Sequence, residues 1–250
     1  MLVSKYNASG NDFVIFQADE KIDRRELAKT ICDRHEGVGA DGMIVVLPNS
    51  ECDFEWQFYN SDGSTASMCG NGSRACAHYA FANGIVSDKN MRFLTGAGII
   101  QAEVDGDMVE VELTKPKKLS EQFEKYGFIW HFCDTGVPHL ISIVDNLNAF
   151  DFEIARKIRY DYNANVNFAI IKNRTELFVR TYERGVEDET LACGTGMAAA
   201  FFTAFNLGLI EAAATVIPKS GERLFLRKNS DKILFKGKVK LTFTANFNQG

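Results

Sequence analysis

Leu191-Ala192-Cys193-Gly194-Thr195-Gly196-Met197-Ala198-Ala199-Ala200 has an earlier counterpart in Met68-Cys69-Gly70-Asn71-Gly72-Ser73-Arg74-Ala75-Cys76-Ala77. Both stretches contain a Cys-Gly-polar-Gly core that leads into a run of small residues. The glycines permit a tight turn, and the run that follows favours a helix with an apolar face. Each cysteine is therefore predicted at a helix N-terminus, where unpaired N–H groups and the helix dipole favour a thiolate and bind an anion such as a carboxylate. One such cysteine in each half indicates a single site built at a pseudo-twofold interface.

Length and composition indicate a soluble globular protein of one large domain or two halves. The chain has 250 residues, 46% of them hydrophobic and 24% charged. A net charge of -5 gives no reason to expect nucleic acid as a partner, because a binding face needs clustered basic residues. We expect no membrane association either. The first residues lead into strand-like sequence without an apolar secretory region, so a cytoplasmic location is expected.

Cysteine usage argues against a zinc site or a disulfide framework. The six cysteines are spread through the chain without CxxC spacing. Most are expected to be small buried hydrophobic residues. They are Cys32, Cys52, Cys69, Cys76, Cys133 and Cys193.

The first half alternates strands with two helices. Asn11 stands in a turn before the apolar run 13–16 and closes an Asx turn or serves the site. The glycine-rich stretch 34–42 follows a helix and lacks phosphate-loop spacing, so we interpret it as a wall of the site. Asn60 lies at the mouth of the turn that leads to Cys69. We predict helices at 23–34, with Asp23 as N-cap, and at 72–82, and strands at 13–16, 43–47, 53–59, 91–95, 99–104 and 108–113.

The second half repeats this order of elements. A polar, proline-containing segment at 114–118 is the best linker candidate. After it we predict strands at 140–144, 165–171 and 177–182, a helix at 150–159, the helix that follows Cys193, and further strands from about 212 to the last one at 238–247.

Two tuned thiols suit the inversion of a stereocentre. A base must take the proton from one face of a flat carbanion and an acid must return one to the other. No lysine motif for pyridoxal phosphate and no metal-ligand pattern is present, so we expect no cofactor and no metal. Glu183 and Arg184 supply an anion for an ammonium group and a cation for a carboxylate, or they form a surface ion pair. His139 orients or deprotonates a cysteine, or it is a hydrogen-bonded core residue.

Over nearly its whole length the sequence resembles the diaminopimelate epimerase family. The resemblance rests on several motifs in one order: Ser9-Gly10-Asn11-Asp12-Phe13, Gly37-Val38-Gly39-Ala40-Asp41-Gly42, Phe58-Tyr59-Asn60-Ser61-Asp62-Gly63, Cys69-Gly70-Asn71-Gly72, Pro138-His139, Asn165-Val166-Asn167-Phe168, Arg180-Thr181-Tyr182-Glu183-Arg184-Gly185 and Cys193-Gly194-Thr195-Gly196. It implies an α+β fold of two pseudo-symmetric domains, each a mostly antiparallel sheet wrapped around a central helix. These would span 1–115 and 116–237, with the last strand, 238–250, returning to the first domain.

The resemblance also implies the activity and the site. The family epimerises LL-2,6-diaminopimelate to the meso isomer in lysine and peptidoglycan precursor synthesis, without pyridoxal phosphate, and it suggests a homodimer. Cys69 and Cys193 would be the acid/base pair, assisted by His139 and Glu183. The substrate would be held by Asn11, Asn60, Gly70, Asn71, Asn165, Glu183, Arg184, Gly194 and Thr195.

Some positions depart from the family pattern. Many members have Gln where Gly42 stands and Asn where Val137 stands, and both contact the substrate. The loop 186–189 is one residue longer than the commonest form. A related racemase of another amino acid, such as histidine or proline, is therefore the alternative within this class. From a different class, a binding protein whose two cysteines form a regulatory disulfide is a second alternative, although it does not need two carboxylate-binding helix starts.

Overall fold

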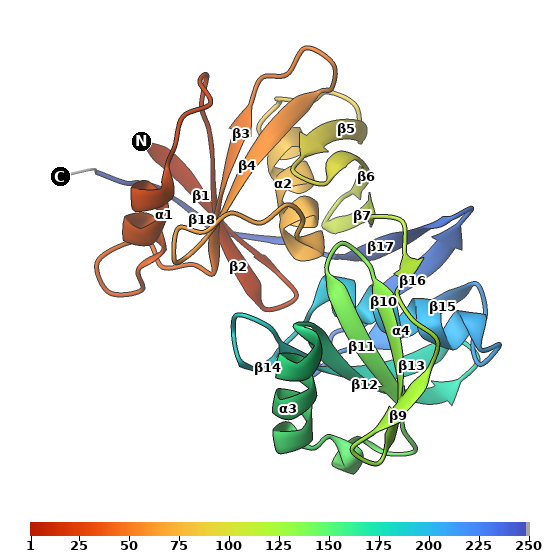
Figure 1. The fold of residues 1–250 in the computed structure, drawn as a ribbon. Helices are drawn as coiled ribbons and strands as arrows, with labels where there is room; N and C mark the ends of the chain where they lie inside the picture. Colours follow the sequence, from red (N-terminus) through yellow and green to blue (C-terminus); the bar gives the residue numbers. More distant parts are fainter. Residues whose placement is uncertain (249–250) are drawn as a thin grey trace. The chain divides into compact units, whose positions relative to one another are not determined.

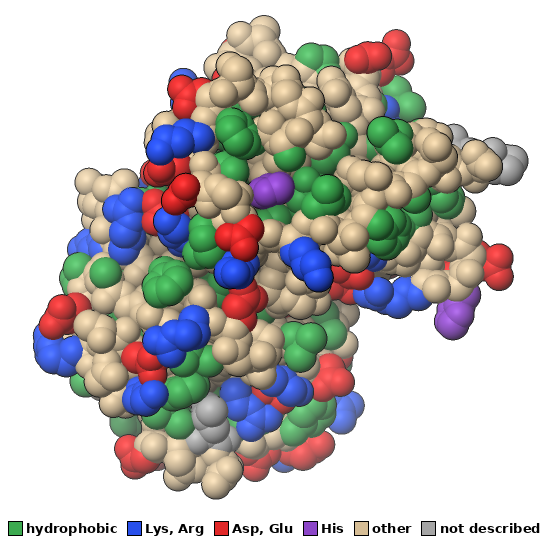
Figure 2. Space-filling view, turned by 180° about the vertical axis from the view of Figure 1, so that it is seen from behind, with side chains coloured by type: hydrophobic (Ala, Val, Ile, Leu, Met, Phe, Trp, Pro, Cys, Tyr) green, Lys and Arg blue, Asp and Glu red, His purple; other side chains and the backbone are tan. Residues whose placement is uncertain are grey.

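The computed structural model describes residues 1–248 and contains two compact units. Unit 1 comprises Met1–Glu112 and the residues from Gly237 onward, and unit 2 comprises Leu113–Lys236 (Figure 1). Among residues 1–248, no helix combines the length and the apolar character needed to cross a membrane. On the face drawn in Figure 2, acidic and basic side chains are interspersed rather than separated by sign.

Unit 1 is a sheet that surrounds one helix. Its strands pair in the order β18-β1-β2-β3-β4-β5-β6-β7, with β2–β3 and β4–β5 parallel and the other pairs antiparallel. Helix α2 packs against strands toward both ends of this order, β1 and β7 among them (Figure 1). The elements are β1 Leu2–Ala8, β2 Asn11–Gln17, α1 Arg25–Cys32, β3 Gly42–Leu47, β4 Phe54–Asn60, α2 Gly70–Ala82, β5 Asn90–Thr95, β6 Gly98–Asp105, β7 Met108–Glu112 and β18 Lys240–Asn246.

Unit 2 has the same plan around α4. Its strands pair in the order β10-β11-β12-β13-β15-β16-β17, with β11–β12 and β13–β15 parallel. The elements are β8 Lys117–Lys118, β9 Phe123–Lys125, β10 Phe128–Asp134, β11 Pro138–Ile143, the short 3₁₀ helix Leu147–Ala149, α3 Phe152–Tyr162, β12 Asn165–Asn173, β13 Glu176–Glu183, β14 Asp188–Thr190, α4 Gly194–Asn206, β15 Ala213–Ile217, β16 Leu224–Asn229 and β17 Lys232–Lys238.

The two units repeat one connection scheme, and this confirms the predicted fold class. A hairpin is followed by a helix that leads to a parallel neighbour, α1 between β2 and β3 and α3 between β11 and β12. A second hairpin then leads to the central helix, α2 or α4, and to the next parallel strand. Such crossovers need a long connection, here one that contains a helix, because parallel strands cannot be joined by a tight turn.

The central helices owe their position to small residues. In α2 the buried residues include Ala75, Ala77 and Ala80, and in α4 they include the run Ala198–Ala200. Alanine favours the helix and lets strands approach its axis closely. A helix that is apolar on most sides is stable only inside a core. The surrounding sheets therefore bury both helices and hold their N-termini in place.

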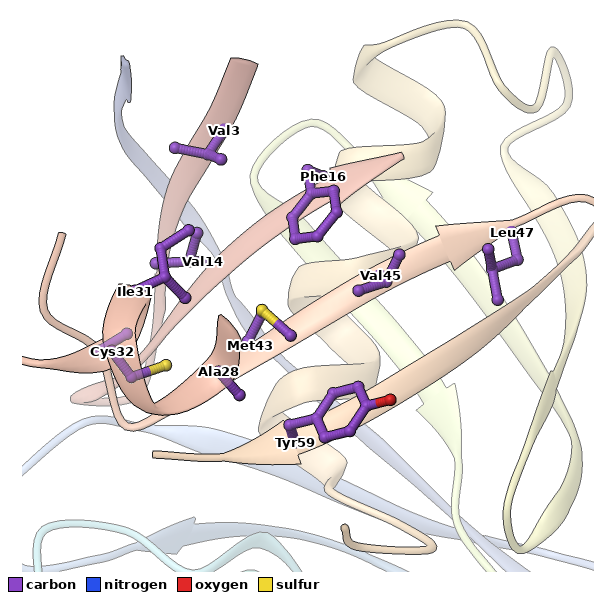
Figure 3. Close-up of a cluster of buried hydrophobic side chains, with 11 residues drawn as sticks. Val3, Val14, Phe16, Ala28, Ile31, Cys32, Met43, Val45, Leu47 and Tyr59 are labelled. Atoms are coloured by element: carbon purple, nitrogen blue, oxygen red, sulfur yellow. The ribbon is translucent and has the colours of Figure 1, made fainter. Parts of the chain in front are cut away.

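Helix α1 differs from its predicted bounds. Its N-cap is Arg24 rather than Asp23, and it ends at Cys32 because Asp33 is extended. Asp23 instead accepts the N–H of Arg25 at 3.1 Å, just before the helix. The helix packs Ile31 and its apolar neighbours into the cluster shown in Figure 3, against side chains of β2, β3 and β4. Packing of this face, rather than a cap, places α1 on the sheet.

Candidate active site

Cys69 is the N-cap of α2. Its backbone is extended, and its Sγ accepts the N–H of Gly72 at 3.3 Å. The first helical bond runs from Ser73 N–H to the carbonyl of Cys69. Helix geometry leaves the N–H groups of Gly70 and Asn71 without partners inside the helix. This end of α2 therefore combines a sulfur with two donors and the positive end of the dipole, as predicted.

Asn11 extends from the start of β2 toward this thiol. Its Oδ1 lies 3.9 Å from Cys69 Sγ, and its Nδ2 donates to Asp41 Oδ2 at 2.7 Å. Because a carboxylate only accepts, Asp41 fixes the oxygen of Asn11 toward the sulfur. The turn before β2 is closed by Asn7, whose Oδ1 accepts the N–H of Gly10. The side chain of Asn11 is thus directed at Cys69 rather than at its own turn.

A charged cluster supports Asn11. Arg34 donates to both oxygens of Asp12, at 3.1 Å, and to Asp41 at 2.8 Å. Lys5 forms an ion pair with Asp12 at 2.8 Å. Burial alone would raise the pKa of Asp12, but these partners lower it to about 2. Two residues of the stretch 34–42, Arg34 and Asp41, thus lie beside Asn11 and Asp12.

Arg74 and Ser64 hold Asn71 and Asn60, the other two asparagines of unit 1 that the sequence predicts as site residues. Arg74 is fully buried and donates to Asn71 Oδ1 at 2.8 Å, to Ser9 Oγ at 2.7 Å and to the carbonyl of Lys238 at 3.0 Å. Asn60, at the end of β4, donates to Ser64 Oγ at 2.9 Å within the following turn. The guanidinium thus orients the Asn71 side chain beneath the start of α2.

Cys193 is the N-cap of α4 and also has an extended backbone. Met197 N–H bonds to its carbonyl, so the N–H groups of Gly194 and Thr195 have no partners inside the helix. Its Sγ lies 3.5 Å from Thr195 Oγ1. The backbone of the first site is repeated, but here the nearby polar atom is a hydroxyl oxygen.

His139 lies behind Thr195 and is completely buried. Its Nε2 is 3.0 Å from Thr195 Oγ1, and its Nδ1 is 3.0 Å from Asn167 Nδ2. Burial, and next the positive charge of Arg184, lower the pKa of His139 to about 3. His139 is therefore neutral near pH 7.

The predicted residues at the ends of β12 and β13 are also held near His139. Asn165 Oδ1 accepts the N–H of Arg184 at 2.8 Å, and Asn165 Nδ2 lies 3.5 Å from His139 Nε2. The Arg184 guanidinium binds the carbonyl of Asn163 at 2.7 Å. Glu183 Oε2 accepts from Thr190 of β14 at 2.9 Å. Glu183 and Arg184 thus each have a partner outside their own pair.

Some residues of these networks were not predicted. They are Asp41, Arg74, Asn167 and Thr181, with Thr181 Oγ1 donating to Asn167 Oδ1 at 2.8 Å. Asn167 had a detectable signal, since residues i and i+2 of a strand share a face and Asn165 was already a candidate. The contact of Asp41 with Asn11 spans 30 residues, and no local pattern indicates it.

Three other cysteines are buried outside both helix starts. Burial raises the pKa of Cys32 and of Cys133 to about 12, and it raises the pKa of the fully buried Cys76 still further. A thiol that resists ionisation is a poor base. Cys52 is only partly buried, in the loop before β4.

Gly42 stands where Gln is common in the family pattern. A Cβ at Gly42 would lie 2.9 Å from the carbonyl oxygen of Tyr59 and 3.2 Å from the ring of Phe58. The first of these distances requires a shift of the backbone. The start of β3 is therefore packed for glycine, and a larger side chain does not fit here as the chain stands.

The sequence model of the family described as Diaminopimelate epimerase matches residues 3–119 and 131–242. The chain belongs to the diaminopimelate epimerase family. It is 58% identical to a diaminopimelate epimerase of a Nitratiruptor species, over 100% of this chain and 99% of that one. It is 55% identical to that of Campylobacter jejuni (strain RM1221), over 98% of both chains, and 45% identical to that of Helicobacter pylori (strain ATCC 700392 / 26695), over 96% and 94%.

Solved structures share the fold of this family member at low sequence identity. A phenazine biosynthesis protein of the PhzF family from Enterococcus faecalis has a TM-score of 0.79 at 12% identity, over 99% of both chains. A probable proline racemase from Agrobacterium radiobacter K84 has a TM-score of 0.76 at 12% identity, over 100% of this chain and 93% of that one. These similarities establish the fold of the diaminopimelate epimerase family for this chain.

Proposed function

We propose that this chain converts LL-2,6-diaminopimelate to meso-diaminopimelate without a cofactor, with Cys69 and Cys193 as the acid and base. The observation that carries the proposal is the repeated helix start, a cysteine N-cap followed by N–H groups without partners inside the helix, in a member of the diaminopimelate epimerase family. The reaction would serve lysine and peptidoglycan precursor synthesis.

The chemistry is a proton exchange at one α-carbon. The thiolate of one cysteine takes the α-hydrogen as a proton, and the electron pair of the broken C–H bond stays on the substrate. The thiol of the other cysteine then donates its proton to the opposite face of this carbanion. The product has the inverted configuration, and the two cysteines have exchanged protonation states. In the reverse direction their roles exchange.

Backbone donors stabilise the charge that develops on the carboxylate. The N–H groups of Gly70, Asn71, Gly194 and Thr195 sit at positive helix ends, where they bind an α-carboxylate. Removal of one such donor typically slows an enzyme by about two to three orders of magnitude. These donors are fixed by the helices before substrate binds, so little reorganisation accompanies the reaction.

Side chains of both units would bind the remaining polar groups. Arg184 supplies a cation for a carboxylate, and Glu183 an anion for an ammonium group. Asn11, Asn60 and Asn165 supply amide donors and acceptors. His139 and Glu183 would assist the cysteines.

The proposal includes a homodimer, which the family resemblance suggests, and a cytoplasmic location. Sedimentation equilibrium of the purified protein checks the dimer, because its mass is independent of shape. Fractionation of the source cells checks the location. A monomer at the concentrations used for assays would contradict the first, and recovery with the membrane fraction would contradict the second.

The decisive experiment follows the α-proton of LL-diaminopimelate by NMR in deuterated water. Reduced protein without pyridoxal phosphate should remove the α-proton signal and produce the meso isomer. Cys69→Ser and Cys193→Ser should each abolish this change, and Cys52→Ser is the matched control because Cys52 lies in a loop outside both helix starts.

The other outcomes separate the alternatives. If another amino acid exchanges its α-proton while diaminopimelate does not, the mechanism stands and the substrate assignment fails, with Gly42 and Val137 the first positions to test. If no amino acid exchanges and the oxidised protein contains a Cys69–Cys193 bond, the regulatory disulfide is supported instead.

A further inference from the structure

We propose that Asn167 is a positioning residue that places the single ring proton of His139 on Nε2, so that His139 donates to Thr195 and the Thr195 hydroxyl donates to Cys193 Sγ. The catalytic consequence rests on the proposed function, because it concerns the state of Cys193. The arrangement itself is a property of unit 2 and can be tested without turnover.

The side-chain amide of Asn167 has one consistent orientation. Its Oδ1 accepts the Thr181 hydroxyl at 2.8 Å, and its Nδ2 donates to the carbonyl of Leu140 at 3.0 Å. A carbonyl oxygen only accepts, so reversing the amide would place two oxygens against each other and leave the nitrogen facing Thr181. Asn167 is fully buried, where such a mismatch is costly.

This orientation determines the tautomer of His139. The same Asn167 Nδ2 lies 3.0 Å from His139 Nδ1 and has a hydrogen to donate. Nδ1 must therefore accept, and in a neutral imidazole the proton is then on Nε2. Asn165 Nδ2 is 3.5 Å from Nε2, at the limit for a hydrogen bond and farther than the Thr195 hydroxyl.

The Thr195 hydroxyl connects His139 to the sulfur of Cys193. Its Oγ1 lies 3.0 Å from His139 Nε2 and accepts that N–H. The hydrogen of the hydroxyl is then free to point at Cys193 Sγ, 3.5 Å away. A donor aimed at sulfur favours the thiolate over the thiol, and the effect is strong because these side chains are buried. In this arrangement His139 acts as a donor and not as the base that deprotonates the cysteine.

The absence of a side chain at Gly196 allows the amide of Asn167 to pack against α4. A Cβ at Gly196 would lie 2.4 Å from Asn167 Oδ1 and 3.0 Å from Thr181 Oγ1. At the equivalent position of α2, a Cβ on Gly72 would have no contact closer than 3.3 Å among its nearest neighbours. The second glycine of the Cys-Gly-Thr-Gly stretch therefore makes room for Asn167.

The tautomer can be observed directly by nitrogen NMR of protein labelled at histidine. His139 is assigned by the loss of its signals in His139→Gln. We expect a protonated Nε2 and an unprotonated Nδ1 that persist from about pH 6 to pH 8, since burial keeps the ring neutral. A proton on Nδ1, or a doubly protonated ring in this range, would overturn the proposal whether or not the protein epimerises diaminopimelate.

Asn167→Asp keeps the size of the side chain and replaces the donor that faces His139 Nδ1 with an acceptor. In Asn167→Asp the carboxylate accepts from Nδ1–H, so Nε2 becomes the acceptor and Thr195 donates to it instead of to the sulfur. The pH profile for alkylation of Cys193 by iodoacetamide, followed by peptide mass spectrometry, should move up by about one unit, which is about tenfold in rate below the pKa. Asn173→Asp adds the same charge on the exposed end of β12, where position 173 already accepts in a turn, and should leave the profile unchanged.

Two variants at His139 separate a donor from a base. His139→Gln keeps an N–H donor without an imidazole, whereas His139→Leu removes both. The donor role predicts an alkylation profile near wild type for Gln and an upward shift for Leu, and Thr195→Val should match Leu. Equal shifts for Gln and Leu, or a folded Asn167→Asp protein with an unchanged profile, would refute the proposal. If Asn167→Asp does not fold, the comparison of His139→Gln with His139→Leu still tests the proposal.

Discussion

The starts of α2 and α4 have the same backbone and different supporting side chains. Both place a cysteine N-cap before a glycine, and in both the next two N–H groups have no partner inside the helix. Around Cys69 the support is charged and partly exposed, with the side chains of Arg34 and Asp41 57% and 42% exposed and that of Asp12 17%. Around Cys193 it is neutral and buried, with His139 and Asn167 both at 0%.

This difference shows that the repeat preserves a backbone and not a set of partners. Asn11 offers an oxygen to Cys69, whereas Thr195 offers a hydroxyl to Cys193. Two thiols that must exchange roles during a reaction are thus given unlike surroundings. If the two surroundings differ in their effects, equivalent substitutions around Cys69 and Cys193 should have unequal consequences.

The largest effect should come from the sulfurs themselves. Cys69→Ser and Cys193→Ser should each lower the rate of epimerisation by about three orders of magnitude, within the range of general acid–base catalysis. The loss of the α-proton and the formation of the meso isomer are measured separately in deuterated water. Normal turnover in either variant would exclude the two-cysteine mechanism and remove the basis of the comparison.

The equivalent glycines should respond unequally to alanine. Gly196→Ala places a Cβ against Asn167 and should lower the free energy of unfolding by about 1–3 kcal/mol. Gly72→Ala meets only ordinary or slightly tight contacts and gains helix propensity, so its change should stay within about 1 kcal/mol. Urea unfolding measures both. Equal losses of unfolding free energy would mean that Asn167 does not restrict the space at position 196.

Stability should depend on pH through His139. Its pKa rises from about 3 in the folded state to 6.5 in the unfolded state, so the unfolded chain binds the extra proton between these values. Stability is therefore present above the unfolded pKa and falls as the pH is lowered, by about 2 kcal/mol between pH 7 and pH 5.

The measurement is urea unfolding at these two pH values, with His139→Gln as the comparison. In His139→Gln, the loss of about 2 kcal/mol between pH 7 and pH 5 that comes from His139 should be absent. Asp12 does not interfere. Its pKa is about 2 in the folded state, so the stability that it contributes is lost only as the pH falls below the ordinary aspartate pKa of 3.8. An identical pH dependence in the variant would contradict a buried neutral histidine.

In unit 1, release of Asn11 should have a moderate effect. Asp41→Asn lets the Asn11 amide rotate and should lower kcat/KM by about tenfold, as expected for the loss of a hydrogen bond to a charged group. Asp19→Asn, at an exposed position outside this cluster, is the control. Steady-state kinetics at low and high salt will show whether the partly exposed cluster is screened. An unchanged kcat/KM would mean that Asp41 does not position Asn11.

The smallest difference concerns capping. Cys69→Ala removes the acceptor of the Gly72 N–H and should cost about 0.5–1 kcal/mol. Within residues 1–248, no side-chain hydrogen bond of Cys193 caps α4, so Cys193→Ala should cost less. Thermal unfolding of the two variants compares them. A greater loss for Cys193→Ala would show that its contact with Thr195 matters for stability as well.

Most of the fold could be predicted because its signals are local. The two Cys-Gly starts, the alanine runs and the alternating strands each lie within about ten residues, and the repeat of the plan follows from their order. The predicted end of α1 was wrong because an exposed helix face carries little information about where packing ends. For the central helix α2, predicted at 72–82, the end at Ala82 was correct and the start lies two residues earlier, at Gly70.

Sequence patterns indicated the candidate residues that lie beside a recognisable turn, but not the residues that support them. Asp41 meets Asn11 because β2 and β3 pair in parallel with Phe13 opposite Gly42. That register is a property of the folded sheet and leaves no trace in either segment alone. Arg74 is one turn into a helix where a buried charge is not expected.

Strand β18 has a consequence for how the chain is made. It pairs with β1 along six positions from Leu2 to Asn7, yet it follows all of unit 2 in the sequence. The ribosome therefore synthesises all of unit 2 before β1 can pair with β18. During synthesis β1 presents an unpaired edge, which is a hazard for aggregation. The domain that is begun first is thus completed last, and loss of β18 would damage the first half of the protein rather than the second.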